Sequence, residues 1–399
     1  MNDRPRFYDN LLKDHFARNR QMAFVSGPRQ VGKTTTCRSL GGAYYNWDNT
    51  ADRKLFLTGP DALAEAMNLA RARAVSPLVV LDELHKYTKW KGFLKGLFDS
   101  YADKMKIAVT GSSRLDIYRR GSDSLMGRYF LYRMHPWTVA ESLNVDLPEG
   151  LFRQPQPIEE EDWQALWTHG GFPEPFLKRD IRFTRRWRSL RNDQLSKEDL
   201  RELTRIQELG TIEVLMQLLA ENSSGQMIYA NYANQLGVTI QTVKRWVDLL
   251  NHLHYGFSLQ PWFASIPKAL RKEPKWFLRE WSGITNEGAK AETFVACHLL
   301  KAVDAWTDMG FGDFQLHYIR TTQKQEVDFA IVRDRKPWML VEVKSGDTKL
   351  APTLGLFQKE LGTEYAFQVV INLPYEPIDC STYRSPTIVP AKTFLSQLV

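Results

Sequence analysis

The sequence has little cysteine and no long apolar run, and each absence excludes a class of protein. No stretch of about 18 apolar residues occurs, which a membrane-spanning helix would need. The N-terminus, Met1–Pro5, also lacks the apolar core of a signal peptide. Three widely separated cysteines, Cys37, Cys297 and Cys380, suggest neither a disulfide framework nor a zinc cluster. We therefore expect a cytoplasmic protein with reduced thiols and no membrane partner.

The length and composition are those of a globular chain with more than one core. The sequence has 399 residues, of which 43% are hydrophobic and 25% charged, enough for about two or three domains. The formal net charge of +7 favours an anionic partner but says nothing about the fold.

A glycine-rich loop near the start of the chain predicts a nucleotide-binding site. Residues 27–34 fit the pattern G-x-x-x-x-G-K-[ST], and the apolar stretch at 22–26 precedes them as a strand. In such a loop, backbone N–H groups surround the phosphates of ATP or GTP, Lys33 reaches the outer phosphates, and Thr34 binds Mg²⁺. The predicted phosphate-binding residues are Gly27, Pro28, Arg29, Gln30, Val31, Gly32, Lys33, Thr34 and Thr35.

A second motif follows at residues 78–83. Leu78–Leu81 is a bounded apolar run of the kind that a buried parallel strand has, and it ends in Asp82 and Glu83. We predict that Asp82 holds the nucleotide's Mg²⁺ and that Glu83 polarises the attacking water, because phosphoryl transfer needs charge neutralisation and an oriented nucleophile. The alternative is that the two acids only cap the next helix.

Strands and helices alternate over this part of the chain, as an open parallel sheet requires. The predicted strands are 22–26, 43–46, 78–81 and 107–110, and helices are expected after the loop and around 61–73 and 90–101. Ser112 and Ser113 follow the fourth strand, where a hydroxyl can sense the outer phosphate or cap a helix. The predicted fold class is therefore α/β, with a P-loop NTPase sheet.

Two segments are candidates for contact with nucleic acid. Residues 178–191 carry seven basic side chains and one acid, so this helix can follow a phosphate backbone or form a solvated face with its aromatics turned inward. Residues 229–236 and 239–252 have a helix-turn-helix pattern, and a β-like stretch follows. This module either touches DNA or serves as a packing domain. Its exposed residues would be Gln241, Thr242, Lys244 and Arg245.

The last part of the chain holds a second chemical group of residues. The stretches 326–332 and 338–344 alternate like half-buried strands, and an antiparallel hairpin around 334–337 would bring Asp328 close to Glu342. Alternation places Glu342 and Lys344 on one face. Two carboxylates with one ammonium suggest a Mg²⁺ or Mn²⁺ site in which the lysine activates water. The alternative is a surface salt-bridge patch.

Together, these motifs resemble a family of prokaryotic AAA-type P-loop ATPases whose C-terminal half is domain of unknown function 4143. The resemblance covers nearly the whole chain. It rests on the two ATPase motifs, on residues 110–113, on Gly127-Arg128 before Pro136 and Glu141, on 170–174, and on 326–329 with 341–344. Two positions depart from the family pattern. His85 stands where relatives commonly have Gln, and the usual Pro-Leu-Ser near residue 136 reads Pro-Trp-Thr here.

The resemblance implies an ATPase core, a winged-helix region and a terminal domain similar to the PD-(D/E)xK nuclease fold. In that fold an acid on the first helix joins two strand acids, and Glu292 matches its position, with Glu287 as an alternative. Asp328, Glu342 and Lys344 match the remaining pattern directly. Such sites bind one or two divalent metals and hydrolyse phosphodiester bonds.

The resemblance also implies a role for Arg128, which matches an arginine that acts on a neighbouring subunit's nucleotide or pairs with a local acid. A homo-oligomer formed through the ATPase domain is the corresponding partner expectation. We predict four segments: an ATPase domain at 1–147, a helical region at 148–211, a winged-helix-like module at 212–282 and a nuclease-like domain at 283–399.

Two functions follow from these assignments. In the first, ATP binding and hydrolysis, with Mg²⁺ as cofactor, control a metal-dependent nuclease-like domain that acts on DNA more readily than on RNA. In the second, the chain is an ATP-dependent switch or scaffold whose terminal domain binds nucleic acid or protein without cleaving it.

Overall fold

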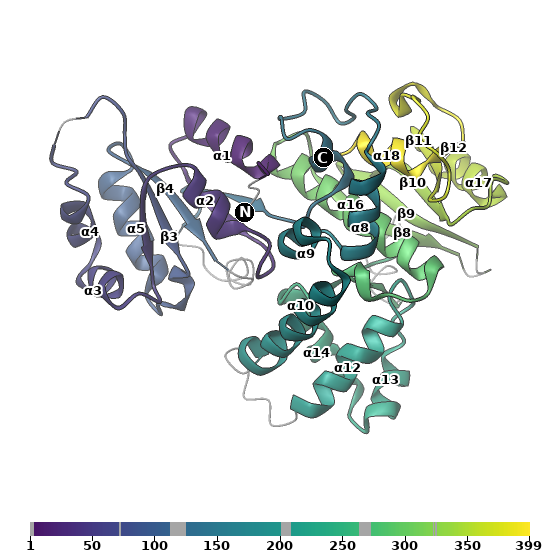
Figure 1. Ribbon diagram of the computed structural model, residues 1–399, viewed down its shortest axis with the longest axis horizontal. Coiled ribbons are helices and arrows are strands. Elements are labelled where there is room, and N and C mark those ends of the chain that lie inside the picture. Colours follow the sequence, from purple (N-terminus) through teal and green to yellow (C-terminus); the bar gives the residue numbers. More distant parts are fainter. Residues whose placement is uncertain are drawn as a thin grey trace. The chain divides into compact units, whose positions relative to one another are not determined.

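The computed structural model of the chain describes residues 4–71, 73–111, 125–200, 209–262, 273–321, 323 and 325–399. Contacts divide it into two compact units, which are described separately (Figure 1). Unit 1 contains Met1–His135 and Val145–Leu147, and unit 2 contains Pro136–Asn144 and Pro148–Val399. Within the described ranges, the helices are too short or too polar for any to cross a membrane. The four predicted segment boundaries stay predictions.

Unit 1 is built on a parallel sheet, as the sequence predicts. The sheet order is β2-β3-β4-β1-β5, and every neighbouring pair is parallel. All five carboxyl ends therefore lie at one edge, the edge where open α/β sheets bind ligands. The strands are β1 (Met22–Ser26), β2 (Ala43–Asn46), β3 (Leu78–Asp82), β4 (Lys106–Thr110) and β5 (Tyr129–Arg133).

Helices cover this sheet, and one of them differs from the prediction. The helix expected around 61–73 ends at Ala66, and a further helix precedes it. The side chain of Asn49 caps that earlier helix, and Gly59, at φ +125°, separates the two. The elements are α1 (Phe7–Arg18), α2 (Lys33–Ser39), α3 (Thr50–Thr58), α4 (Pro60–Ala66), the 3₁₀ turn η1 (Leu84–Lys86) and α5 (Trp90–Tyr101).

Unit 2 contains a mixed sheet in the order β12-β11-β10-β9-β8. β8, β9 and β10 pair antiparallel, whereas β10, β11 and β12 pair parallel. The predicted hairpin is confirmed: β9 and β10 are joined by Asp334 and Arg335, both at positive φ, as a tight two-residue turn requires. The strands are β8 (Phe314–Arg320), β9 (Glu326–Arg333), β10 (Lys336–Lys344), β11 (Tyr365–Val370) and β12 (Thr387–Pro390), with helices α16 (Glu287–Asp308), α17 (Pro352–Leu361) and α18 (Ala391–Ser396).

The rest of unit 2 is mainly helical and includes the predicted helix-turn-helix. α13 (Tyr229–Leu236) and α14 (Ile240–His252) are joined through Gly237 at φ +66°, and Thr239 caps α14 by accepting from the Thr242 N–H. A two-stranded antiparallel sheet follows, formed by β6 (Gly256–Leu259) and β7 (Lys275–Leu278). The other elements are α7 (Val139–Leu143), α8 (Glu160–His169), α9 (Pro173–Lys178), α10 (Ile181–Gln194), the π-helical turn η3 (Leu195–Asp199), α12 (Leu209–Glu221) and the 3₁₀ turns η4 (Trp281–Gly283) and η5 (Cys380–Thr382).

The three cysteines are free and buried, and burial raises the pKa of each thiol. A raised thiol pKa lowers the population of the reactive thiolate. This agrees with the expectation of inert, reduced thiols.

A buried ion pair joins α7 to α16 inside unit 2. Lys301 Nζ lies 2.5 Å from Glu141 Oε2 and donates to Thr138 Oγ1 at 3.0 Å. The side chains of Lys301 and Glu141 are both fully buried. Because removing one partner leaves an uncompensated charge in the interior, the pair is costly to break.

We expect Glu141→Met to lower the free energy of unfolding of unit 2 by about 3 kcal/mol, since it removes the carboxylate that lies 2.5 Å from the buried Lys301 ammonium. The double variant Glu141→Met/Lys301→Met should recover most of that loss, because the two methionines replace the charges with apolar groups of similar length. Urea denaturation measures the free energy of unfolding of the parent and of both variants. Equal stabilities for Glu141→Met and the parent would show that the pair does not hold α7 to α16.

Candidate functional site

The predicted phosphate loop runs from the end of β1 into α2. Gly27 and Gly32 have φ values of +147° and +105°, and Gln30 also has positive φ. A Cβ on Gly27 would lie 2.3 Å from the Met134 carbonyl oxygen, so close packing against the end of β5 requires a glycine there. Val31 is fully buried, and its carbonyl accepts from Arg6 Nη1 at 2.8 Å. The loop is therefore in contact with the end of β5 through Gly27 and with Arg6 through Val31.

Lys33 lies inside this loop. Its side chain is buried, and Nζ donates to the carbonyl oxygens of Gly27 and Pro28, each at 2.8 Å. Burial lowers the pKa of Lys33 to about 8, although the nearby Glu83 and Asp82 act in the opposite direction. An ammonium whose hydrogen bonds go to neutral carbonyls in a buried loop is available to an incoming anion.

The Asp82 carboxylate connects the loop to two further strands. Asp82 Oδ2 accepts from Thr34 Oγ1 at 2.9 Å and from the Tyr44 hydroxyl at 2.6 Å. Asp82 Oδ1 accepts from Thr110 Oγ1. Burial, followed by the hydrogen bond to Asp82, raises the pKa of Tyr44 to about 12. The predicted pair of Thr34 and Asp82 is thus brought together, and sequence reasoning missed Tyr44 and Thr110 as its partners.

Glu83 stands directly after Asp82 with a left-handed backbone, at φ +55°. Its Oε2 lies 3.4 Å from Lys86 Nζ and 3.7 Å from His85 Nε2. Lys86 also lies 2.7 Å from the Asp48 carboxylate, so it links Glu83 to the segment after β2. His85, one of the departures from the family pattern, therefore faces the predicted water-activating acid.

Arg128 lies at the opposite edge of the sheet from the phosphate loop. It comes just before β5, which runs parallel to β1, so the length of a five-residue strand, roughly 16 Å, separates it from the loop edge. Its Nε and Nη2 donate to the two carboxylate oxygens of Asp99 at 2.7 and 3.0 Å. The local pairing is thus present, and the distance excludes action on the chain's own loop. Ser112 and Ser113 lie outside the described residues.

In unit 2 the hairpin brings the predicted strand acids close to each other. Asp328 Oδ2 accepts from the Val343 N–H at 2.9 Å, and Lys344 Nζ donates to Glu342 Oε1 at 2.8 Å. Glu342 and Lys344 therefore lie on one face of β10, as alternation predicts. Burial, and then the charge of Asp328, raises the pKa of Glu342.

A lysine that sequence reasoning missed lies among these acids. Lys275 Nζ, from β7, is 2.5 Å from Glu326 Oε1 and 3.5 Å from both Glu292 Oε2 and Asp328 Oδ1. These carboxylates raise the pKa of Lys275 against the effect of burial, and burial followed by Asp328 raises the pKa of Glu292 to about 7. The only sequence signal for Lys275 is its position as a charged residue at the start of the otherwise apolar stretch 275–278.

The two candidate sites differ in their fit to a metal. Thr34 and Asp82 offer the hydroxyl and carboxylate oxygens that a nucleotide-bound Mg²⁺ uses beside phosphates, so the first site fits ATP with Mg²⁺. In the second site an ammonium stands between the acids. Over the described part of the chain, no three His, Cys, Asp or Glu side chains form a group that could hold a metal ion. Metal binding by Glu292, Asp328 and Glu342 thus stays a prediction that this arrangement does not fit.

Family models match most of the chain. An AAA domain matches residues 19–143, a domain of unknown function (DUF8612) matches 160–286, and a domain of unknown function (DUF4143) matches 287–393. These matches confirm the predicted combination of an AAA-type P-loop ATPase domain with a DUF4143 domain.

Similar curated proteins and solved structures add little about function. An uncharacterized protein of Mycobacterium tuberculosis, Rv2008c, and one of Mycobacterium bovis, Mb2031c, are each 25% identical over 332 residues, covering 79% of this chain and 69% of theirs. Aeropyrum pernix ORC1 in complex with DNA has a TM-score of 0.32 at 14% identity, over 72% of this chain and 90% of that one. AMPPCP-bound DnaA from Aquifex aeolicus has a TM-score of 0.30 at 14% identity, over 61% and 86%. Scores this low carry no inference about ligand or partner.

The lowered pKa of Lys33 predicts a pH-dependent affinity for nucleotide. The ammonium form binds phosphate, and with a pKa of about 8 it falls from about nine-tenths of the population at pH 7 to about one-tenth at pH 9. We expect the Kd of a fluorescent ATP analogue with Mg²⁺ to rise about tenfold over this range.

Two variants serve as controls for this titration. Lys33→Met should bind weakly at every pH. Tyr44→Phe should keep the pH dependence, because the pKa of Tyr44, about 12, lies above the range. A parent Kd that is the same at pH 7 and pH 9 would contradict the assignment.

Proposed function

We propose that the chain binds and hydrolyses ATP at the carboxyl edge of the unit 1 sheet. The observation that carries this proposal is the Asp82 carboxylate, which accepts from Thr34 of the phosphate loop beside the buried Lys33. Residues 27–35 would surround the phosphates with backbone N–H groups. Thr34 and Asp82 would hold Mg²⁺, which supplies charge neutralisation when it is bound.

Glu83 is the proposed residue that orients the attacking water. Its contacts with Lys86 and His85 support this role, since they hold the carboxylate beside the loop edge. Lys86 is shared with Asp48, so the position of Glu83 depends on the end of β2 as well as on β3.

Substitutions at Lys33 and Glu83 separate binding from hydrolysis. Lys33→Ala should abolish nucleotide binding, because it removes the ammonium that meets the phosphates. Glu83→Gln should leave binding intact and lower hydrolysis by about a hundredfold or more, as expected for a lost general base. Phosphate release and equilibrium nucleotide binding measure the two effects. Undiminished hydrolysis by Glu83→Gln would remove its assigned role.

We further propose that Arg128 acts on the nucleotide of a second copy of the chain in a homo-oligomer. The position of Arg128 at the far edge of its own sheet supports action between subunits. In that role Arg128 would have to leave its bidentate pair with Asp99, so assembly would compete with a local ion pair.

For unit 2 we infer binding of nucleic acid, with DNA preferred, through a winged-helix-like module. The second helix of the module, α14, supports this inference, because Val243, Trp246 and Val247 are buried while Lys244 and Arg245 are exposed. The strand pair β6–β7 follows α14 as the hairpin of a winged helix would.

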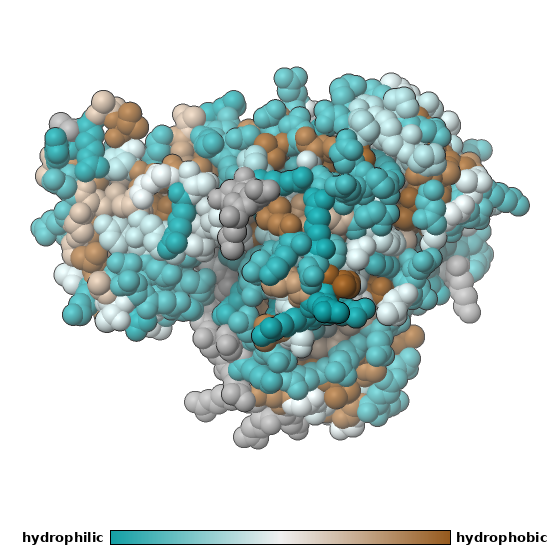
Figure 2. All heavy atoms as spheres, in the orientation of Figure 1, coloured by the Kyte–Doolittle hydropathy of each residue, from teal (hydrophilic) through white to brown (hydrophobic). Residues whose placement is uncertain are grey.

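The basic helix α10 is a second surface that supports this inference. Thr184 and Trp187 are buried, and the guanidinium of Arg191 lies over the Phe172 ring, so part of the helix faces the interior. Side chains over α9 and α10 are predominantly hydrophilic on the face that Figure 2 shows. The exposed basic residues are Lys178, Arg182, Arg185 and Arg186.

Charge reversal on α14 tests nucleic-acid binding. Lys244→Glu/Arg245→Glu should weaken binding of duplex DNA about tenfold or more at moderate salt, because two phosphate contacts are lost. The slope of log affinity against log salt should fall by about two. The control Lys349→Glu/Lys359→Glu makes the same charge change on exposed side chains elsewhere in unit 2. Equal losses of DNA affinity in both double variants would show that the effect comes from net charge and not from contacts made by α14.

Between the two predicted functions of unit 2, we propose binding without cleavage. Lys275 among the acids supports this choice, because a metal-dependent nuclease needs those carboxylates for its metal. Cleavage of DNA or RNA through Glu292, Asp328, Glu342 and Lys344 stays a prediction without support from this arrangement.

A further inference from the structure

The side chain of Lys275 is buried in the place where the acidic residues of unit 2 meet. Its residue exposure is 4%, and the rest of β7, Trp276–Leu278, is equally buried. The ammonium has three carboxylates around it, from Glu292 on α16 and from Glu326 and Asp328 on β9. An ammonium removed from water needs polar or charged partners, and here three carboxylates supply them.

Neighbouring groups fix the lysine at both ends. Its backbone forms an antiparallel bridge with Gln226, and its ammonium lies 5.7 Å from the centre of the Tyr318 ring. Its closest carboxylate, Glu326, is held in turn by Arg320 Nη1 at 2.6 Å. The position of the ammonium is therefore set by the fold and not by a freely rotating side chain.

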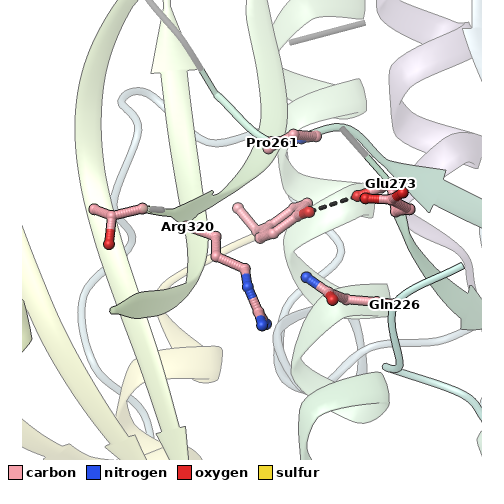
Figure 3. Close-up of a pocket in the computed structure, with 6 residues that line it drawn as sticks. Gln226, Pro261, Glu273 and Arg320 are labelled. Carbon is pink, nitrogen blue, oxygen red and sulfur yellow. Dashed lines mark hydrogen bonds between the residues drawn. The ribbon is translucent and has the colours of Figure 1, made fainter. Parts of the chain in front are cut away.

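A small pocket of about 90 Å³ adjoins this network (Figure 3). In Figure 3 the side chains of Arg320 and Gln226 point toward one another, and the Tyr318 hydroxyl donates to the Glu273 carbonyl at 2.6 Å. In the amide orientation that satisfies both groups, Gln226 accepts from Arg320 Nη1 at 3.0 Å. The network thus runs from Gln226 through Arg320 and Glu326 to Lys275.

The ammonium and a divalent cation would compete for the same oxygens. Mg²⁺ and Mn²⁺ bind carboxylate oxygens at about 2.1 Å. Oxygens of Glu292 and Asp328 both lie 3.5 Å from Lys275 Nζ, so a metal bound between them would lie close to the ammonium. Two cations so close in a buried site repel strongly. The fourth acid, Glu342, is paired separately with Lys344.

We propose that Lys275 is the resident cation of the acidic site formed by Glu292, Glu326 and Asp328. Its ammonium neutralises the carboxylates that would otherwise bind a divalent metal, so the native chain does not hold Mg²⁺ or Mn²⁺ there. In a chain without this ammonium the three carboxylates, which form no metal-holding group in their present positions, are expected to close around a divalent metal. The Lys275 ammonium comes from β7, whereas the acids are carried by α16 and β9. A segment of the winged-helix-like module therefore closes the site.

The test measures binding of Mn²⁺ to the full chain in the absence of nucleotide. Free Mn²⁺ is detected by its paramagnetic signal. Lys275→Met keeps most of the aliphatic stem and removes the charge. We expect this variant to bind about one more Mn²⁺ per chain than the parent, with a Kd at least tenfold lower than any binding by the parent. Adding Asp328→Asn should remove the gained site.

Two control chains and one replacement variant complete the experiment. Lys349→Met removes an exposed lysine of unit 2 and should bind as the parent does. Asp328→Asn alone should bind Mn²⁺ as the parent does, because Lys275 occupies the site in both chains. If Lys275→Met does not fold, as judged by circular dichroism, Lys275→Gln replaces it, since its amide can still donate to Glu326.

Two outcomes would overturn the proposal. The first is Mn²⁺ binding by the native chain that disappears in Asp328→Asn, because it would show an open metal site beside the lysine. The second is a folded Lys275→Met or Lys275→Gln chain that binds no more Mn²⁺ than the parent. Neither result bears on the ATPase proposal, since nucleotide is absent from the measurement.

Discussion

A buried ammonium group has to be surrounded by oxygen atoms, and three lysines of this chain meet that requirement in three ways. Lys33 is surrounded by carbonyl oxygens of the phosphate loop, Lys301 by a carboxylate and a hydroxyl, and Lys275 by carboxylates from two elements. Each of the three ion sites joins segments that are distant in the sequence or folds a loop back on itself. The loop, helix and strand around each ammonium must therefore be placed so that their oxygen atoms reach it.

The partners decide what each ammonium is able to do. The Lys33 ammonium donates to two neutral carbonyls, and burial lowers its pKa to about 8 although the charges of Glu83 and Asp82 act in the opposite direction. A bound phosphate would stabilise the charged form further. Carboxylates compensate Lys275 fully, and its pKa rises instead. The first lysine is thus prepared to receive phosphate, whereas the second already has its counter-ions. We propose that the lysine side chain binds phosphate in unit 1 and occupies an acidic site in unit 2.

Much of the fold could be predicted from local pattern. Four of the five strands of unit 1, the helix-turn-helix and the β9–β10 hairpin each have a signal within a few neighbouring residues, and each is found within a residue or two of its predicted place. The phosphate loop and Asp82 were predicted for the same reason. Helix α3 was missed because its start depends on the cap at Asn49, a signal that a periodicity search does not weigh.

The partners of the site residues could not be predicted, because they come from distant segments. Tyr44 reaches Asp82 across 38 positions, and Lys275 reaches Asp328 across 53. No local pattern distinguishes Lys275 from an ordinary strand-end lysine. Only the packing of β7 against the mixed sheet brings an ammonium group among these carboxylates.

The close packing of the phosphate loop against the end of β5 has a mechanical consequence. Gly27 packs against the Met134 carbonyl, and the Met134 N–H donates to the Ser26 carbonyl. The Arg6 guanidinium donates to the carbonyl oxygens of both Val31 and His135. His135 is the last residue before the chain leaves unit 1 at Pro136. A change in the shape of the loop would therefore disturb the backbone around Met134 and His135, where the chain first crosses from unit 1 to unit 2.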